Sequence, residues 1–161
     1  MSVQADCWEG RPWPLPDAVA QPFFDAAGCG RLQLQRCVNC GTAVFYPRPY
    51  CTVCLGELQW IEACGKGCIY TFTVIRQNLS RAWRGQVPYV VVMVELPEGV
   101  RMMGNLVACP ADEVHIGMPV EALFVSSSAW TGGETAGSGE PTSDRAGRPA
   151  RGLVLWHPIP G

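Results

Sequence analysis

The stretch CVNCGTAVFYPRPYCTVC, residues 37–54, carries two Cys-x-x-Cys pairs separated by ten residues. Each pair presents two thiolates on one short turn, and two such turns clamp a single metal ion from opposite sides. A closed set of four sulfur ligands favours Zn²⁺, with iron or a set of unmetallated thiols as the alternatives. Because no coordination position is left for water or substrate, we expect a structural site. Its predicted ligands are Cys37, Cys40, Cys51 and Cys54.

Glycines accompany both pairs. Gly41 directly follows Cys40, and Gly56 lies two residues after Cys54. We expect these glycines to give the backbone the freedom that lets amide groups point at sulfur. The loop between the pairs, residues 43–50, is too apolar for a free solvent loop. It is therefore expected to pack on the barrel or on a partner.

Composition limits the function classes that fit the chain. The 161 residues suffice for one ordinary domain with a small attached module. The 18 glycines and 14 prolines argue against long helices and favour a mainly β structure. With a net charge of −2 and a pI of about 5.6, the chain lacks the general attraction that binders of nucleic acid or anionic membranes use.

The cellular compartment is predicted from what the sequence lacks. No stretch approaches the length of apolar residues that a membrane helix needs, and residues 1–16 do not resemble a secretory signal. We therefore predict a cytoplasmic protein, where nine cysteines are more often ligands or buried thiols than disulfides. Of the thiols outside the motif, Cys68 and Cys109 lie in or beside predicted strands and are expected to be small core residues.

The rest of the chain is predicted to be rich in strands. Pro22 and the glycines at 28 and 30 bound a short helix. Residues 32–36 alternate apolar and polar side chains, as a half-buried strand does. Further short strands are expected at 44–46 and 59–61, beside the second cysteine pair. Runs rich in β-branched and aromatic residues predict the strands of a small closed barrel at 69–75, 89–96, 100–106, 120–125 and 153–156.

No catalytic constellation is recognisable. The only histidines, His115 and His157, stand in no known catalytic sequence context. No serine elbow, phosphate loop or dinucleotide fingerprint is present. These observations favour a non-catalytic role over a free-standing enzyme that uses a cysteine or a histidine.

The ordered set of motifs resembles a known family. A short helix around Phe23 and Phe24 is followed by the two cysteine pairs, by GKGCIYTFTV at 65–74, by PYVV at 88–91 and by IGMPV at 116–120. This order is similar to that of the bacterial and archaeal family of small proteins that join a rubredoxin-like zinc ribbon to an OB-fold, long catalogued as a domain of unknown function and associated with acyl-CoA metabolism. The resemblance covers roughly residues 20–127.

The resemblance implies a short helix and a zinc ribbon followed by a five-stranded barrel. We therefore expect a mainly β chain with three parts, in which the N-terminal arm and an insertion before residue 153 depart from the family pattern. Residues 1–30 would form an N-terminal arm and a short helix, residues 31–63 a rubredoxin-like zinc ribbon, and residues 64–161 a five-stranded OB-fold barrel. A flexible insertion is expected around 131–152, where glycine, serine, threonine, glutamate and proline dominate.

The resemblance also implies a function. The chain would be a non-catalytic accessory subunit of a thiolase or acyltransferase complex, bracing a thiolase-like catalytic subunit and helping to hold CoA or acyl-CoA as a shared ligand. A hydratase or aldolase complex acting on acyl-CoA is the alternative partner. The expected partner interface contains Phe23, Phe24, Arg48 and Tyr50, against the alternative that these side chains pack in the core.

Residues 76–84 are the candidate CoA contact. Guanidinium groups suit phosphates, and an indole ring stacks on adenine, which points to Arg76, Arg81, Trp83 and Arg84. The alternative is an ordinary solvated loop. A module that binds single-stranded nucleic acid remains a second function class, because OB barrels and zinc ribbons both serve it, although the acidic balance opposes it.

Overall fold

The computed structural model describes residues 14–126 and 151–159. The described chain has a short helix, a three-stranded sheet and a closed five-stranded barrel, so it is mainly β as predicted. Of the N-terminal arm, residues 1–16 with Trp8 and Trp13, only residues 14–16 are described, and most of the predicted flexible insertion at 131–152 also lies outside the described residues. In the described part of the chain, no helix is long and apolar enough to cross a membrane.

Helix α1 (Gln21–Gly28) begins after an aspartate turn and ends at glycine. The Ala20 N–H donates to Asp17 Oδ1 at 2.8 Å before the first turn. Pro22 occupies the first turn, where its missing N–H leaves no bond unmade. Gly30 then adopts φ +71, and its N–H donates to Ala27 O. The predicted short helix is confirmed, and it buries Phe23, Phe24, Ala26 and Ala27.

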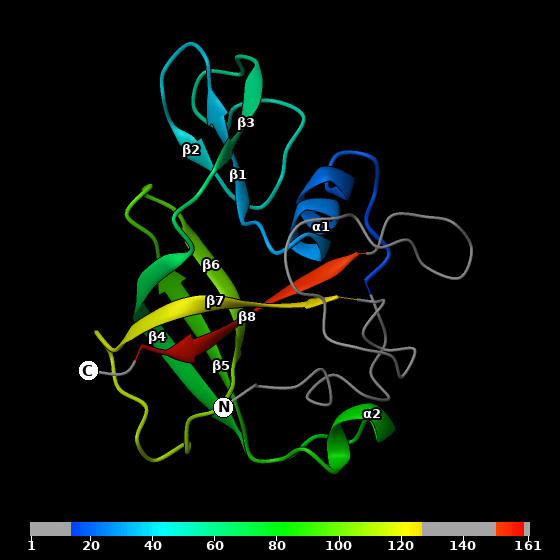
Figure 1. Cartoon of the computed structure of the whole chain (residues 1–161), viewed down its shortest axis with the longest axis vertical. Coiled ribbons are helices and arrows are strands. Elements are labelled where there is room, and N and C mark those ends of the chain that lie inside the picture. Colours follow the sequence, from blue (N-terminus) through cyan, green and yellow to red (C-terminus); the bar gives the residue numbers. More distant parts are fainter. Residues whose placement is uncertain (1–13, 127–150, 160–161) are drawn as a thin grey trace.

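The ribbon sheet is small and antiparallel. Strand β1 (Gln33–Cys37) is central and pairs with β2 (Ala43–Val44) on one side and β3 (Leu58–Glu62) on the other. The cysteine pairs lie at the turns beyond these strands, at the end of the ribbon remote from the barrel (Figure 1).

The barrel has the strand order of an OB-fold. Strands β4 (Lys66–Ile75), β5 (Tyr89–Glu95) and β6 (Arg101–Leu106) form an antiparallel meander. Strand β8 (Gly152–Pro158) pairs with β7 (Pro119–Ser126) and briefly, in parallel, with β6, while β7 returns to β4. The closed order β4-β5-β6-β8-β7 is that of the five-stranded OB barrel.

The barrel core follows the alternation of its strands. Its fully buried side chains come from facing strands and include Ile69, Val92, Val94, Met102, Val120 and Trp156. Since Ile69 points inward, its neighbour on β4, Cys68, must point outward, and it is exposed. The expectation that Cys68 is a core residue was therefore wrong. Cys109, in the loop after β6, is partly buried and packs against the core, so the expectation holds in part for it.

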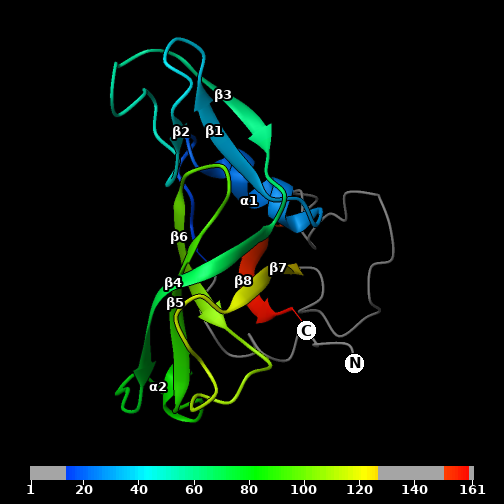
Figure 2. The same ribbon diagram turned by 90° about the vertical axis from the view of Figure 1, so that its left-hand side faces the viewer.

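Helix α1 connects the ribbon to the barrel (Figure 2). It contacts β1 of the ribbon as well as β7 and β8 of the barrel. Where it meets β8, a Cβ atom added at Gly152 would overlap the backbone of Ala27 and Gly28. The side chain of Glu98, in the β5–β6 turn, accepts the Cys64 N–H at 2.8 Å and so holds the linker between ribbon and barrel. These contacts fix how the ribbon sits on the barrel.

Candidate metal centre and pocket

The first cysteine pair forms a tight hydrogen-bonded turn. The N–H of Cys37 donates to Thr42 O at 2.9 Å, and the N–H of Gly41 donates to Cys37 O at 3.0 Å. Gly41 has φ +74, a backbone conformation that is unfavourable for any residue with a side chain. The predicted need for a glycine at this position is therefore explained by the geometry of the turn.

The second pair repeats the turn with one difference. The N–H of Cys51 donates to Gly56 O at 3.0 Å, and the N–H of Leu55 donates to Cys51 O at 3.1 Å. Leu55, and not Gly56, has the positive φ, at +58. Gly56 is needed for space instead, because a Cβ there would lie 2.6 Å from Asn39 Nδ2 and 3.2 Å from Cys54 Sγ. The N–H of Gly56 points at the Cys54 sulfur, as the sequence predicted for an amide of this turn, although Gly56 itself does not have a positive φ.

The two turns bring the four predicted sulfur ligands together. Cys37 Sγ lies 3.4 Å from Cys54 Sγ, and Cys40 Sγ lies 3.6 Å from Cys51 Sγ. All four Sγ atoms lie within 4.8 Å of one another. A tetrahedral zinc site with Zn–S bonds of about 2.3 Å has S–S edges of roughly 3.8 Å, so the residues fit the ion. Among the described residues this is the one cluster of potential metal ligands.

Hydrogen bonds shift the pKa values of Cys40 and Cys54 in opposite directions. The side-chain hydroxyl and the backbone N–H of Thr42 lower the pKa of Cys40 to about 6. At Cys54 the N–H of Gly56 lowers the pKa, but thiol–thiol hydrogen bonds with Cys37 and Cys40 outweigh it and raise the pKa to about 12. Thiols this close cannot all ionise without a cation, and a bound divalent cation removes that obstacle.

The loop between the pairs packs on helix α1. The rings of Phe45 and Tyr46 lie 5.5 Å and 6.3 Å from the ring of Phe23. The buried side chain of Gln35 accepts the N–H of Arg48 at 2.7 Å. The loop was expected to pack on the barrel or on a partner, and these contacts instead place it against helix α1 and the ribbon strand β1.

The four residues expected at a partner interface divide into two kinds. Phe23 and Phe24 are 5% and 7% exposed, which places their rings inside the chain and leaves little of them for a partner. Arg48 and Tyr50 are exposed beside the second cysteine pair. An interface role stays a prediction, and it now depends on Arg48 and Tyr50.

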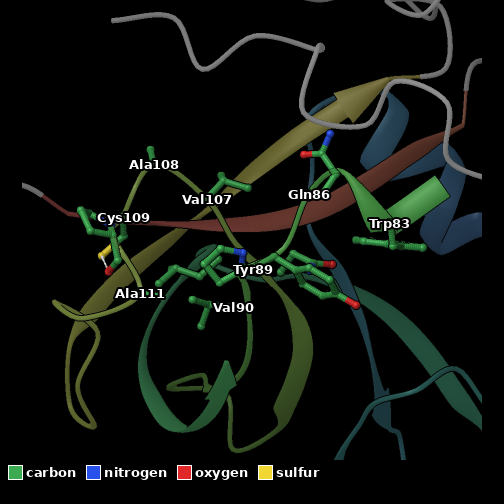
Figure 3. Close-up of a pocket in the computed structure, with 12 residues that line it drawn as sticks. Trp83, Gln86, Tyr89, Val90, Val107, Ala108, Cys109 and Ala111 are labelled. Atoms are coloured by element: carbon green, nitrogen blue, oxygen red, sulfur yellow. Dashed lines mark hydrogen bonds between the residues drawn. The ribbon is translucent and has the colours of Figure 1, made fainter. Parts of the chain in front are cut away.

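A pocket of about 370 Å³ opens at the other end of the barrel. Helix α2 (Arg81–Arg84) and the start of β5 form one wall, and the loop after β6 forms the other. The ring of Trp83 lies 4.8 Å from that of Tyr89, and Asn78 Nδ2 donates to the Tyr89 hydroxyl at 2.9 Å. Figure 3 shows these two rings at one end of the pocket, with Cys109 and Ala111 at the other.

Of the predicted CoA contacts, only Trp83 lines this pocket. Arg76 is exposed after β4, and Arg81 and Arg84 are exposed on α2. Arg84 Nη2 donates to Leu79 O at 3.3 Å, which holds α2 against its own entry loop. The sequence did not indicate the contribution of the loop at 107–111, because that loop carries no charged side chain.

The histidines and Cys109 form no catalytic arrangement among the described residues. His115 Nδ1 contacts the backbone oxygen of Glu113, and His157 Nε2 lies 3.3 Å from Glu121 Oε1. Neither histidine lines the pocket. Burial, and then the charges of Glu113 and Asp112, raise the pKa of Cys109, which makes it a poor nucleophile at neutral pH.

Comparisons with known proteins agree with this architecture. Residues 24–59 match the family model described as the rubredoxin-like zinc ribbon domain of ChsH2, and residues 60–125 match the C-terminal OB-fold domain of ChsH2. A chain in the solved structure described as "Ltp2-ChsH2(DUF35) aldolase" is 30% identical, with a TM-score of 0.69 over 91% of this chain and 98% of that one. The chain belongs to the DUF35 family.

Two curated relatives show how the family is described. A "DUF35 domain-containing scaffold protein" of Methanocaldococcus jannaschii is 42% identical over 55% of this chain and 64% of the relative. A "probable enoyl-CoA hydratase alpha subunit" of Thermomonospora curvata is 40% identical over 68% of this chain and 34% of the relative. The match thus spans just under two thirds of the first relative and about one third of the second.

Proposed function

We propose that this chain is a non-catalytic accessory subunit of a complex that processes acyl-CoA. The observation that carries the proposal is its similarity to a chain of the structure described as "Ltp2-ChsH2(DUF35) aldolase", which extends over 98% of that chain. The scaffold and hydratase-subunit descriptions of the relatives support it. The pocket also offers no nucleophile paired with a base.

The proposed metal is a structural Zn²⁺ held by Cys37, Cys40, Cys51 and Cys54. Support comes from the four convergent sulfurs and from the zinc-ribbon family match. The ion would supply no chemistry beyond cross-linking the two turns. Strands β1, β2 and β3 bury little apolar surface of their own, so we expect the ribbon at 31–63 to depend on the ion and the barrel at 64–161 to provide the larger core.

The proposed partner is a catalytic subunit of the hydratase or aldolase type. The printed descriptions of the relatives favour these two over the thiolase-type partner that the sequence first suggested. A thiolase-like partner stays a prediction. Arg48 and Tyr50 are the proposed contacts, because both are exposed on a loop that Gln35 and the aromatic cluster hold in place.

The proposed shared ligand is the CoA moiety. Trp83 and Tyr89 form an aromatic wall on which adenine would stack, and the exposed Arg76, Arg81 and Arg84 lie on the segment that leads to that wall. Stacking on an aromatic ring is worth about 1–3 kcal/mol. In the assembled complex, Trp83→Ala is therefore expected to weaken CoA binding about tenfold in titration calorimetry, and Trp83→Phe much less.

Co-expression tests the assembly. The chain is produced with candidate hydratase, aldolase and thiolase subunits from its genomic neighbourhood, and the purified complexes are weighed by native mass spectrometry. We expect a stable hetero-oligomer with one of them, weakened by Arg48→Glu combined with Tyr50→Ser and unaffected by Ile116→Ser, an exposed residue on the barrel. A folded, zinc-loaded chain that joins none of them, or that turns over acyl-CoA alone, would refute the proposal.

A further inference from the structure

The four cysteines of the metal centre differ in their exposure to solvent. Cys37 and Cys51 are 2% and 0% exposed, whereas Cys40 and Cys54 are exposed. A reagent that attacks the centre from solution therefore meets the exposed residues Cys40 and Cys54 first.

These two exposed sulfurs occupy equivalent places in the two turns but have different neighbours. Thr42 Oγ1 lies 3.2 Å from Cys40 Sγ, two residues further along the chain. The equivalent of Thr42 in the second turn is Gly56, which has no side chain. An added Cβ there would lie 2.6 Å from Asn39 Nδ2 and 3.2 Å from Cys54 Sγ, so a side chain would require Asn39 to move. A hydroxyl therefore reaches one of the two exposed sulfurs only.

The direction of this hydrogen bond follows from the chemistry of a ligand. A cysteine that binds a metal has lost its proton and can only accept, so the Thr42 hydroxyl must donate to the Cys40 thiolate. Donation to an anion gives a short, strong hydrogen bond and draws electron density away from the sulfur. The Cys40 thiolate is thereby held in place and made less nucleophilic, while the equivalent position beside Cys54, Gly56, offers its backbone N–H but no hydroxyl.

We infer that Thr42 is a positioning residue of the metal centre, which holds Cys40 on the ion and leaves Cys54 as the sulfur that reacts first. An alkylating electrophile such as iodoacetamide would form a carbon–sulfur bond at Cys54 and release iodide. The resulting neutral thioether is a weaker ligand, and the centre then loses its metal. This inference rests on the proposed zinc site.

The experiment uses the full zinc-loaded chain and two variants of matched shape. Thr42→Val keeps the branched side chain without the hydroxyl, and Thr42→Ser keeps the hydroxyl. Iodoacetamide is added at neutral pH, zinc release is followed with a chromophoric chelator, and the first alkylated cysteine is located by peptide mass spectrometry. Each protein is also loaded with Co²⁺, whose sulfur-to-metal charge-transfer band reports on donation by the thiolates.

Wild type and Thr42→Ser are expected to be alkylated first at Cys54. Thr42→Val is expected to release zinc about tenfold faster, to show early alkylation at Cys40 as well, and to shift the cobalt band to longer wavelength; tenfold lies within the usual effect of removing an outer hydrogen bond. First alkylation of the wild type at Cys40, or equal release rates and band positions in all three proteins, would overturn the inference. Absence of stoichiometric zinc from the wild type would instead refute the proposed zinc site.

Discussion

Leu55 occupies in the second cysteine turn the place that Gly41 occupies in the first. Both residues have a positive φ, +58 for Leu55 and +74 for Gly41. Each donates its N–H to the backbone oxygen of the first cysteine of its pair. The two turns therefore impose the same backbone conformation on very different residues. Only the glycine adopts it without steric cost.

Replacing Leu55 with asparagine is expected to stabilise the zinc-loaded chain by about 0.5–1 kcal/mol. Asparagine tolerates the left-handed conformation, whereas other side chains there cost roughly 1–2 kcal/mol. Leu55 is 76% exposed, so little packing is lost. Gly41→Ala has open space around it but a positive φ, and should destabilise by about 1 kcal/mol. Urea unfolding measures both changes, and a Leu55→Asn variant less stable than wild type would contradict the strain argument.

Removal of one ligand tests the metal centre. Cys37→Ser is expected to abolish stoichiometric zinc in elemental analysis and to release the ribbon from its fold, because structural zinc contributes about 10–16 kcal/mol of binding free energy in small domains. The matched control is Cys68→Ser, an exposed thiol on β4 outside the cluster, which should keep the zinc. Full zinc content in Cys37→Ser would show that the four sulfurs do not act together.

Gln35 is expected to hold the loop between the cysteine pairs. Its side chain is 6% exposed and accepts the Arg48 N–H, so Gln35→Leu leaves that donor without its acceptor. Such a loss costs about 1–3 kcal/mol, and a cost near 1 is expected here because the bond is only partly buried. Gln59→Leu, an exposed glutamine on β3, should change stability by less than about 0.5 kcal/mol. Equal stability of the two variants in thermal unfolding would argue against an anchoring role.

Cys109 provides a test of pH dependence. Burial, Glu113 and Asp112 raise its pKa, so the neutral thiol is the form that the fold favours. The corresponding stability is present below the pKa of the unfolded thiol and is lost as pH rises through the higher folded pKa. Glu113→Gln removes one negative charge and should lower the pKa of Cys109, speeding its alkylation at pH 8 by about twofold, since the charge is exposed and screened. Glu57→Gln on the distant ribbon is the control, and a rate at Cys109 unchanged by Glu113→Gln would exclude the charge effect.

The sequence predicted the architecture because its signals there are local. Cysteine spacing and runs of β-branched residues indicate where turns and strands form, and the family resemblance supplied their order in the barrel. Individual side-chain environments were less predictable. Gln35 acquires its role only when residue 48 folds back on it, the contact of Thr42 with Cys40 depends on the side-chain geometry of the turn, and the strained backbone at Leu55 has no sequence signal. The outward direction of Cys68 follows from the inward direction of Ile69, which required knowing which face of β4 is buried.

The packing of α1 on the barrel gives the last prediction. Gly152 lies on β8 directly against the backbone of Ala27 and Gly28, so the methyl group of Gly152→Ala would overlap atoms that cannot rotate away. Relief requires the helix to move off the strand, and overpacking of this kind costs about 1–3 kcal/mol. Gly85→Ala, where an added methyl group meets open space and φ is −81, is the matched control and should be nearly neutral. Because α1 also holds the ribbon, Gly152→Ala should weaken assembly with the partner while zinc content stays complete. A free energy of unfolding equal to that of wild type in Gly152→Ala would mean that the helix does not pack against β8 as described.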